Sequence, residues 1–330
     1  MTKICIIGGS GFIGTAIANR LKDRGEAFTL VDIRDSQTHG EHVVTADITH
    51  KDSLPEAVQG DSIIHLAAVH RDDVRPLSRY DDVNITGTEN VCAAAVANGI
   101  ERIVFASSVA VYGFAEPGTD ETGAIAPFND YGRTKMGAEE VLLKWQAADP
   151  TRRSLTVIRP TVVFGPGNRG NVYNLFNQIA SGRFVMIGPG ENQKSMAYVG
   201  NIADFFLHFI TAPPGVRAYN YVDGPDLSMN RLVTLVRGDL LAKTGVGLRL
   251  PTTVGYAIGA VAEVVSRLTG RRLPISRVRA KKFVSTTSFA TRFSDEHQFQ
   301  PKMKLEDAIH ETLDAEFINP DPTRPEFLTE

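Results

Sequence analysis

The sequence predicts an α/β protein: a doubly wound parallel sheet with helices on both faces, followed by a smaller C-terminal α/β region. Two observations predict the sheet. Short apolar runs of strand length alternate with longer segments of helical spacing, and glycines gather where the first run ends. A third observation predicts the smaller region, because after Pro160 glycine and proline become frequent and the regular alternation is lost.

The alternation accounts for the first half of the chain in order. Buried parallel strands read as continuous apolar runs, and helices place apolar residues three or four positions apart. The expected strands are Lys3–Ile7, Phe28–Ile33, Val43–Asp47, Ser62–Leu66, Arg102–Ala106 and Leu155–Arg159. The expected helices are Thr15–Arg24, Leu54–Gln59, Asp81–Asn98 and Tyr131–Ala148, the last capped by Asp130.

Composition limits the class of protein. The chain has 330 residues, of which 42% are hydrophobic and 22% charged, and a net charge of −3. This indicates a globular protein and gives no electrostatic reason to expect nucleic acid as a partner. Cys5 and Cys92 lack spaced partners, so neither a disulfide framework nor a metal site is expected. The longest apolar stretch, Val254 to Val265, is too short to span a bilayer, and no signal-peptide pattern is present; we expect a cytoplasmic protein.

The glycine-rich turn carries the clearest functional signal. Gly8, Gly11 and Gly14 follow the first strand directly and open the first helix. Glycine lets the backbone approach a pyrophosphate, and the unpaired amides and dipole of a helix N-terminus stabilise its charge. The turn therefore predicts a Rossmann-type dinucleotide site, whose expected contacts are Gly8, Gly11, Phe12, Ile13 and Gly14.

A carboxylate at the end of the second strand indicates which dinucleotide binds. Asp32 can accept hydrogen bonds from both ribose hydroxyls of NAD and would repel the extra phosphate of NADP. Arg34 could accommodate that phosphate, so NAD is expected and NADP is the alternative. After the third and fourth strands the expected cofactor contacts are Asp47, Ile48, Leu66, Ala67 and Ala68, whereas His65 is expected to be a packed histidine.

Tyr131 and Lys135 lie four residues apart and so share one face of a helix. An ammonium held beside a phenol stabilises the phenolate and lowers its pKa, which makes the two an acid/base pair. A Tyr and a Lys spaced in this way are usually surface residues. The dinucleotide turn favours the chemical interpretation, because a bound cofactor gives such a pair a reaction to assist.

Seven ordered motifs together resemble one family. They are Gly8-x-x-Gly11-x-x-Gly14, Asp32, His65-Leu66-Ala67-Ala68, Asn84-x-x-Gly87-Thr88-x-Asn90, Ser107-Ser108-x-x-Val111-Tyr112-Gly113, Tyr131-x-x-x-Lys135 and Arg159-Pro160-x-x-Val163-Phe164-Gly165-Pro166-Gly167. This pattern resembles the extended short-chain dehydrogenase/reductases, in particular the NAD-dependent nucleotide-sugar epimerases and dehydratases. The match covers roughly residues 3 to 240.

The resemblance implies a role for each matching residue. Tyr131 would be the acid/base tyrosine, and Lys135 would lower its pKa and hold the nicotinamide ribose. Ser108 would hydrogen-bond the reacting oxygen, with Ser107 as the alternative if the alignment is shifted by one. Asn84 would support the lysine. Pro160 would lie where the family holds the nicotinamide carboxamide.

The resemblance also narrows the reaction. Sugar dehydratases carry an Asp-Glu pair beside the serine, where this chain has Val109-Ala110. Epimerisation and 4-keto reduction both remain. The resemblance favours a nucleotide-sugar epimerase, acting through a 4-keto intermediate on a UDP-hexose or UDP-N-acetylhexosamine, because epimerases are frequent in the family. The open alternatives are a nucleotide-4-keto-sugar reductase of the UDP-N-acetylquinovosamine type, a steroid- or flavonoid-like ketoreductase, and a non-catalytic NAD(P)-binding protein. The family context implies polysaccharide biosynthesis and a homodimer.

The substrate side departs from the family pattern. Lys194, Tyr198 and Asn201 stand where epimerases usually have Arg, His and Asp. Lys194 keeps a positive charge for a diphosphate but loses the bidentate fork of arginine. Substrate contacts are expected from Ser108, Asn171 and Lys194. The basic cluster from Arg271 to Lys282 could hold a diphosphate, although a solvated charged surface is the simpler interpretation.

The expected domain division follows the same signals. Residues 1–164 form the dinucleotide-binding domain, and 196–213 are expected to return to it. Residues 165–195 and 214–318 form the substrate-binding region, and 319–330 a flexible tail rich in Pro, Asp and Glu.

Overall fold

The computed structural model describes residues 3–71, 74–257, 260, 283–293 and 299–328. Its centre is a seven-stranded sheet in the order β11-β6-β5-β4-β1-β2-β3, with every neighbouring pair parallel. The strands are β1 (Ile4–Ile7), β2 (Phe28–Asp32), β3 (Val43–Thr45), β4 (Ser62–His65), β5 (Arg102–Ala106), β6 (Ser154–Pro160) and β11 (Gly215–Tyr221). The chain order reverses between β1 and β4, as in doubly wound dinucleotide-binding folds. The predicted fold class is confirmed.

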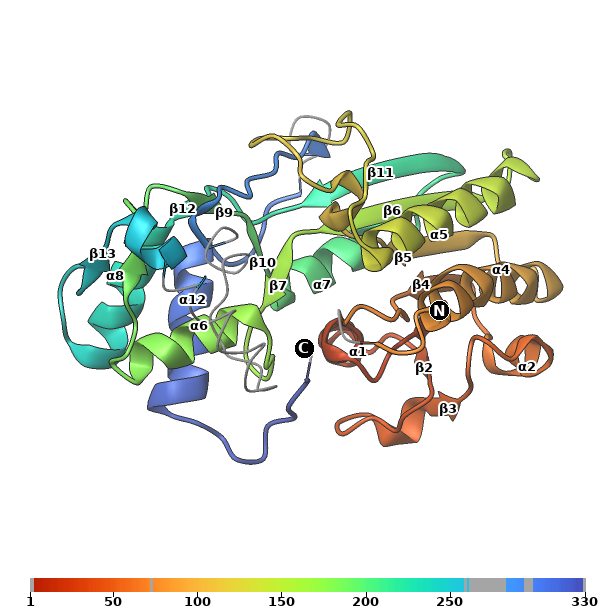
Figure 1. Cartoon of the computed structure of the whole chain (residues 1–330). Coiled ribbons are helices and arrows are strands. Elements are labelled where there is room, and N and C mark those ends of the chain that lie inside the picture. The colour runs from red at the N-terminus through yellow and green to blue at the C-terminus, as the bar shows by residue number, and fades with distance from the viewer. Residues whose placement is uncertain (1–2, 72–73, 258–259, 261–282, 294–298, 329–330) are drawn as a thin grey trace.

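Helices cover both faces of this sheet (Figure 1). On one face α1 (Phe12–Asp23) packs against α7 (Val199–His208), and their apolar side chains join those of Ile4, Ile6 and Leu30 in one core. On the other face a second core joins alternate strand residues to the helices α2 (Leu54–Ala57), α4 (Gly87–Ala97) and α5 (Asp130–Ala147). Both faces of every central strand are therefore buried, which explains the continuous apolar runs.

The smaller region lies beside the carboxyl edge of the sheet and has its own core (Figure 1). Its helices are α6 (Asn171–Ala180), α8 (Met229–Leu241) and α12 (Leu305–Leu313). Three short strand pairs accompany them: β7 (Val162–Phe164) with β10 (Met196–Tyr198), β8 (Met186–Ile187) with β13 (Arg249–Leu250), and β9 (Gln193–Lys194) with β12 (Leu227–Ser228).

Short helical turns complete the described chain. They are the 3₁₀ turns η1 (Gly40–His42), η2 (Lys51–Ser53) and η4 (Val109–Tyr112), the single α-helical turn α3 (Ser78–Tyr80), and the π-helical turns η3 (Asp81–Thr86) and η5 (Asp314–Ile318). The expected helix from Asp81 to Asn98 therefore consists of two parts, η3 followed by α4. Within the described residues no helix is long and apolar enough to cross a bilayer.

Two expected boundaries differ from the structure. The return to the main sheet does not stop at residue 213, because β11 pairs along its whole length with β6. The expected flexible tail, 319–330, also makes hydrogen bonds to the second region. Phe327 donates a backbone hydrogen bond to the Gly167 carbonyl and accepts one from the Arg169 amide, so residues near the end of the described chain bind the second region.

The expected cap of the long helix α5 is wrong by one residue. Asn129, not Asp130, caps α5: its backbone is extended and its side chain accepts a hydrogen bond from the Gly132 amide at 2.9 Å. Asp130 is already helical and pairs with Arg133 instead. The sequence could not decide between two adjacent residues that both favour caps.

Candidate active site

The glycine turn forms a close-fitting cradle at the carboxyl ends of β1 and β4. Gly8 has φ +79°, and a Cβ added there would lie 2.6 Å from the Ala67 amide nitrogen. A Cβ on Gly14 would lie 2.6 Å from the Gly9 backbone, so the turn packs directly on the start of α1. Leu66 and Ala67 both donate backbone hydrogen bonds to the Ile7 carbonyl. The turn and the β4 loop thus meet at the point where the strand order reverses.

Asp32 lies beside this cradle at the end of β2. One carboxylate oxygen accepts a hydrogen bond from the Ser10 amide at 3.0 Å, and the other accepts one from the Arg34 amide at 3.1 Å. The carboxylate is half-buried, whereas Arg34 is exposed. Asp32 is therefore fixed against the glycine turn.

The two residues that follow β3 have different environments. Asp47 is half-buried and accepts hydrogen bonds from both the amide and the hydroxyl of Thr49. Ile48 is buried in the core, where a Cβ on Gly87 would lie 2.6 Å from its side chain. The Ile48 carbonyl accepts a hydrogen bond from Asn90. The packing of Ile48 gives Gly87 and Asn90 of the sequence motif a structural role.

Asn84 connects the loop after β4 to the helix α5. Its amide oxygen accepts a hydrogen bond from the Val69 amide, and its amide nitrogen donates to the Val69 carbonyl and to the Thr134 hydroxyl. Thr134 immediately precedes Lys135, so Asn84 contacts the helix beside the lysine, and its support of the lysine itself stays an expectation. His65 is fully buried against Phe105 and Thr88, as expected of a packed histidine.

The structure brings Ser108, Tyr131 and Lys135 together where β5 ends. Burial raises the pKa of Tyr131, and a hydrogen bond with Ser108 acts in the opposite direction. Lys135 is buried, donates from Nζ to the Ala106 carbonyl at 2.6 Å, and lies over the Phe105 ring. Burial lowers the pKa of Lys135 to about 7, against the opposing charge of Glu139. Lys135 donates to the Ala106 carbonyl in this structure. The expected lowering of the Tyr131 pKa by the lysine is therefore not found.

The two adjacent serines are clearly distinguished. Ser107 is buried and its hydroxyl donates to Glu139, while its amide donates to the Ile158 carbonyl. Ser108 caps the η4 turn by accepting from the Ala110 amide at 3.1 Å and also hydrogen-bonds Tyr131. The geometry therefore favours Ser108 over Ser107 as the serine beside the tyrosine.

The other two predicted substrate residues, Asn171 and Lys194, lie in the second region. Asn171 is exposed at the first position of α6. Lys194 lies on β9 and donates from Nζ to the Ser285 carbonyl at 2.6 Å, and burial lowers its pKa to about 8. Tyr198 donates to Glu311, and Asn201 donates to Asp223 and Met303, so these two departures from the family pattern have structural roles. The basic cluster lies outside the described residues, as does most of the apolar stretch from Val254 to Val265.

Two buried charges beside the site were missed by the sequence analysis. Glu139 and Arg159 form a bidentate ion pair with N–O distances of 3.0 and 2.6 Å. Arg159 also donates to the Tyr112 hydroxyl, which in turn donates to Asn220. One available signal was the position of Glu139, one further turn along the helix from Tyr131 and Lys135.

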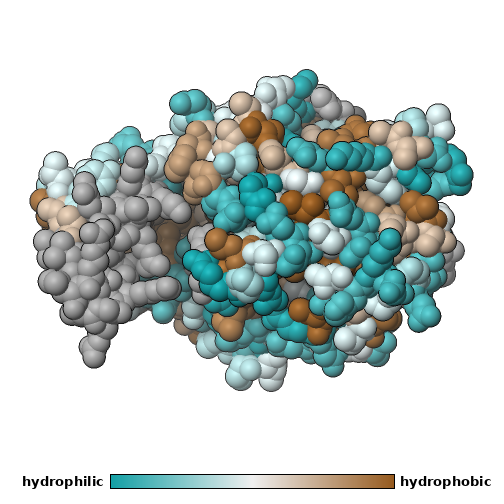
Figure 2. All heavy atoms as spheres, turned by 45° about the vertical axis from the view of Figure 1, so that its right-hand side comes forward, coloured by the Kyte–Doolittle hydropathy of each residue, from teal (hydrophilic) through white to brown (hydrophobic). Residues whose placement is uncertain are grey.

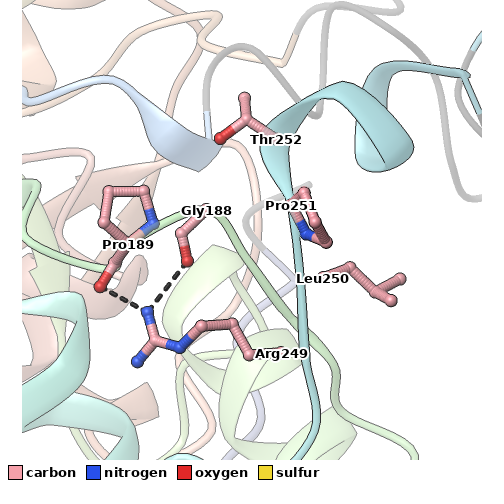
Figure 3. A pocket seen from close by; sticks show the side chains of 6 residues that line it. All are labelled: Gly188, Pro189, Arg249, Leu250, Pro251 and Thr252. Carbon is pink, nitrogen blue, oxygen red and sulfur yellow. Dashed lines mark hydrogen bonds between the residues drawn. The ribbon is translucent and has the colours of Figure 1, made fainter.

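One pocket lies away from these residues, beside β8 and β13. Its volume is about 320 Å³, and it is lined by Gly188, Pro189, Arg249, Leu250, Pro251 and Thr252 (Figure 3). Figure 3 shows the Arg249 guanidinium turned toward the Gly188 and Pro189 carbonyls, to which it donates hydrogen bonds. Its donors are occupied by the protein itself, and none of the predicted catalytic residues lines this pocket. This pocket is therefore not part of the candidate active site.

The fold and the cradle define a dinucleotide-binding enzyme of the α/β class. Residues 4–221 match the model of the NAD dependent epimerase/dehydratase family. The chain is also 43% identical, over 99% of both chains, to N-acetyl-alpha-D-glucosaminyl-diphospho-ditrans,octacis-undecaprenol 4-epimerase of Escherichia coli O157:H7. It is 30% identical to 2-alkyl-3-oxoalkanoate reductase of Stenotrophomonas maltophilia, over 84% of this chain and 86% of that protein.

A solved structure supports the fold independently. The UDP-glucose 4-epimerase of Thermus thermophilus in complex with NAD aligns with a TM-score of 0.71 at 19% identity, over 94% of this chain and 98% of that one. The chain belongs to the NAD dependent epimerase/dehydratase family. It is an enzyme of the sugar-epimerase type, and the family expected from the motifs is confirmed.

Proposed function

We propose that this protein is a 4-epimerase for an N-acetylhexosamine carried on a diphosphate, with NAD as its cofactor. The observation that carries the proposal is the meeting of Ser108, Tyr131 and Lys135 beside the glycine cradle, in a chain 43% identical to a 4-epimerase of such a sugar. Asp32 supports NAD over NADP, because its carboxylate is fixed and half-buried while Arg34 is exposed.

The residues present fit a dinucleotide. The cradle has no room for a Cβ at Gly8 or Gly14, and unpaired amides at the start of α1 favour a pyrophosphate. Asp32 would hold the adenosine ribose, Asp47 and Ile48 would border the adenine, and Lys135 and Pro160 would lie beside the nicotinamide. Leu66, Ala67 and Ala68 would line the path between them. Once bound, NAD supplies a hydride acceptor that can return the hydride.

Residues of the chain itself then remove and return the proton of the sugar hydroxyl. Tyr131 removes the proton from the sugar 4-hydroxyl and later returns it, and Ser108 hydrogen-bonds the same oxygen. In the proposed mechanism the Lys135 ammonium stabilises the phenolate form of Tyr131 once NAD is bound, which requires Nζ to turn from the Ala106 carbonyl that it binds here. Return of hydrogen to the opposite face of the 4-keto sugar inverts the configuration, which makes the reaction an epimerisation. Substrate contacts from Asn171 and Lys194 remain part of the proposal.

Two kinds of diphosphate are candidates for the group that carries the sugar. The sequence motifs favour a nucleoside diphosphate, whereas the relative from Escherichia coli is named for a polyprenyl diphosphate. One observation favours the lipid carrier. Phe114 and Phe128 stack with ring centroids 4.5 Å apart, and their exposed fractions are 83% and 47%. They lie at the two ends of the loop between Tyr112 and Asn129, so this exposed apolar pair follows Ser108 and precedes Tyr131 in the chain.

The proposal is tested with both substrates. We expect purified protein to interconvert the 4-epimers of polyprenyl-diphosphate-linked N-acetylglucosamine, and UDP-N-acetylglucosamine serves as the second arm. Denatured protein should release NAD rather than NADP. Inactivity with both sugars would refute the proposal, and activity with the UDP-sugar alone would refute the lipid carrier.

Tyr131→Phe tests the proton path directly. Removing the phenol oxygen leaves the ring but eliminates acid/base catalysis, so we expect activity to fall by about 10²–10⁴-fold. NAD binding, measured by calorimetry, should remain near that of the unmodified protein. Unchanged turnover in this variant would contradict the proposed role.

A homodimer and a cytoplasmic location remain proposals. Light scattering on the purified protein measures the first, and a monomer across the micromolar range would reject it. On the face shown in Figure 2, hydrophobic and hydrophilic residues are interspersed across the part that the structure describes. The surface of a dimer would therefore have to lie elsewhere or be of mixed polarity.

A further inference from the structure

Three residues of α5 bind three successive residues at the end of β5. Tyr131, Lys135 and Glu139 are spaced by four and so form one row along the helix. Lys135 donates to the Ala106 carbonyl, Glu139 accepts from the Ser107 hydroxyl, and Tyr131 hydrogen-bonds Ser108. The first two members of the row are proposed catalytic or cofactor-binding groups. The third has no assigned role.

Glu139 also binds the neighbouring strand. Its two carboxylate oxygens accept from Nε and Nη2 of Arg159, at 3.0 and 2.6 Å, and both side chains are only 9% exposed. Arg159 directly precedes Pro160, the expected neighbour of the nicotinamide. A single carboxylate thus holds the ends of β5 and β6 against the helix that carries Tyr131 and Lys135.

We propose that Glu139 is a positioning residue for catalysis: it fixes the Ser107-Ser108 segment and the end of β6 relative to Tyr131, and it provides the counter-charge for the buried Lys135 ammonium. This inference rests on the proposed function. A buried, bidentate and charge-assisted contact restricts geometry more strongly than a neutral one, which suits a residue that sets distances between reacting groups.

The electrostatic part of the role follows from the groups around Lys135. His65 on β4 is fully buried and burial lowers its pKa to about 3, so it carries no charge near neutral pH. Arg159 on β6 is paired with Glu139 and carries the same charge as the ammonium, so it does not favour the protonated lysine. Tyr131 lies one turn away on the same helix. Glu139 is the group that favours the protonated lysine, against burial.

The test is Glu139→Gln, which keeps an acceptor for Ser107 but removes the charge. We expect kcat to fall by about tenfold to a hundredfold with a smaller change in KM. The pH at which activity declines on the alkaline side should shift downward, because Lys135 loses its proton more easily. Asp204→Asn is the matched control: Asp204 is a buried carboxylate on α7 paired with Arg24. That variant should leave the pH profile in place.

Two further variants separate positioning from folding. Glu139→Gln combined with Arg159→Gln removes both buried charges, and circular dichroism reports whether the fold is kept. If the Glu139–Arg159 pair serves only stability, the activity lost in Glu139→Gln should return in the double variant, because no unpaired buried charge is left. If Glu139 serves the site, activity should stay low and the alkaline limb shifted. Ser107→Ala should lower kcat without moving that limb, since it leaves the charge of Glu139 in place.

A substrate-free measurement distinguishes failure of this inference from failure of the proposed function. NMR titration of the Lys135 side chain in the NAD-bound enzyme should show a lower pKa in Glu139→Gln than in the unmodified protein, whatever the sugar. An unchanged Lys135 titration together with an unchanged pH profile would overturn the inference. Inactivity of the unmodified protein toward both sugars, with the Lys135 shift intact, would overturn only the proposed function.

Discussion

Gly8 combines two restrictions that a larger residue could not meet. Its φ of +79° lies in the left-handed region, and a Cβ would approach the Ala67 backbone to 2.6 Å. Gly25 shares the first restriction, with φ +64°, but a Cβ there would meet no heavy atom within 4 Å. The two glycines therefore separate the cost of the backbone conformation from the cost of the close approach.

Replacement of each glycine by alanine measures these costs. We expect Gly25→Ala to lower the free energy of unfolding by about 1 kcal/mol, the cost of a left-handed non-glycine residue. Gly8→Ala should cost more than that and should also weaken NAD binding, because the Ala67 backbone must move. Urea unfolding and calorimetric titration with NAD measure the two effects. Equal losses in the two variants, with NAD affinity unchanged, would contradict the close-approach argument.

His65 makes the stability of the fold depend on pH. Burial, and to a smaller extent the charge of Lys135, lowers its folded pKa to about 3, below the ordinary value of about 6.5 in an unfolded chain. Because the folded state keeps the imidazole neutral, its contribution is present above pH 6.5 and is lost as the pH falls toward 3.

The expected size of this effect is testable. At pH 5 His65 alone should make the protein about 2 kcal/mol less stable than at pH 7. His65→Gln cannot bind a proton in this range, so its stability should change less between the two values. Chemical unfolding at both pH values gives the comparison. The same pH dependence in the variant and the unmodified protein would show that other groups cause it.

At the scale of elements, the cap of α5 lies two residues before Tyr131, the proposed acid/base residue. Asn129 accepts from the Gly132 amide, and Tyr131 is the second residue of the helix. Ser228 caps α8 in the same way by accepting from the Arg231 amide. Both Asn129→Ala and Ser228→Ala should therefore cost about 1 kcal/mol of stability.

Only the first of these cap variants should affect catalysis. Loss of the Asn129 cap frees the first turn of α5, which carries Tyr131, so we expect a lower kcat at temperatures where the protein is still folded. Ser228→Ala should leave kcat unchanged. Steady-state assays beside thermal melts measure both. A decrease in kcat of equal size in the two variants would mean that general stability, not the position of Tyr131, controls the rate.

The elements also show how far sequence reasoning reaches. The central strands were predictable because both of their faces are buried and they read as apolar runs. β11 was missed because Gly215–Tyr221 alternates apolar and polar residues at a sheet edge and is only partly buried. The Ser108, Tyr131 and Lys135 motif was visible, but Glu139 was not. A glutamate on a helix usually faces solvent, and its partner Arg159 comes from a strand that only the fold brings close.

At the scale of the whole molecule, the end of the described chain joins the second region to the cofactor cradle. Arg169 forms ion pairs with Glu316 and Glu326 at 2.5 and 2.6 Å. Beside them Phe327 exchanges backbone hydrogen bonds with Gly167 and Arg169, and its ring lies 5.6 Å from that of Phe12. Phe12 opens α1, directly after Gly11 of the cradle. The segment that holds Glu316, Glu326 and Phe327 is therefore in contact with the residue that borders the expected pyrophosphate site.

Phe327→Ala tests whether this connection matters for cofactor binding. The lost aromatic contact should cost about 1 kcal/mol and release the Phe12 ring, and we expect NAD affinity to fall about fivefold. Leu328→Ala is the matched control, because the adjacent Leu328 is 73% exposed. Calorimetry with NAD and thermal melts of both variants provide the measurements. Since NAD would stabilise only the folded state, the cofactor-dependent rise in Tm should shrink for Phe327→Ala alone. An equal rise in both variants would show that the segment supports the fold without influencing the cradle.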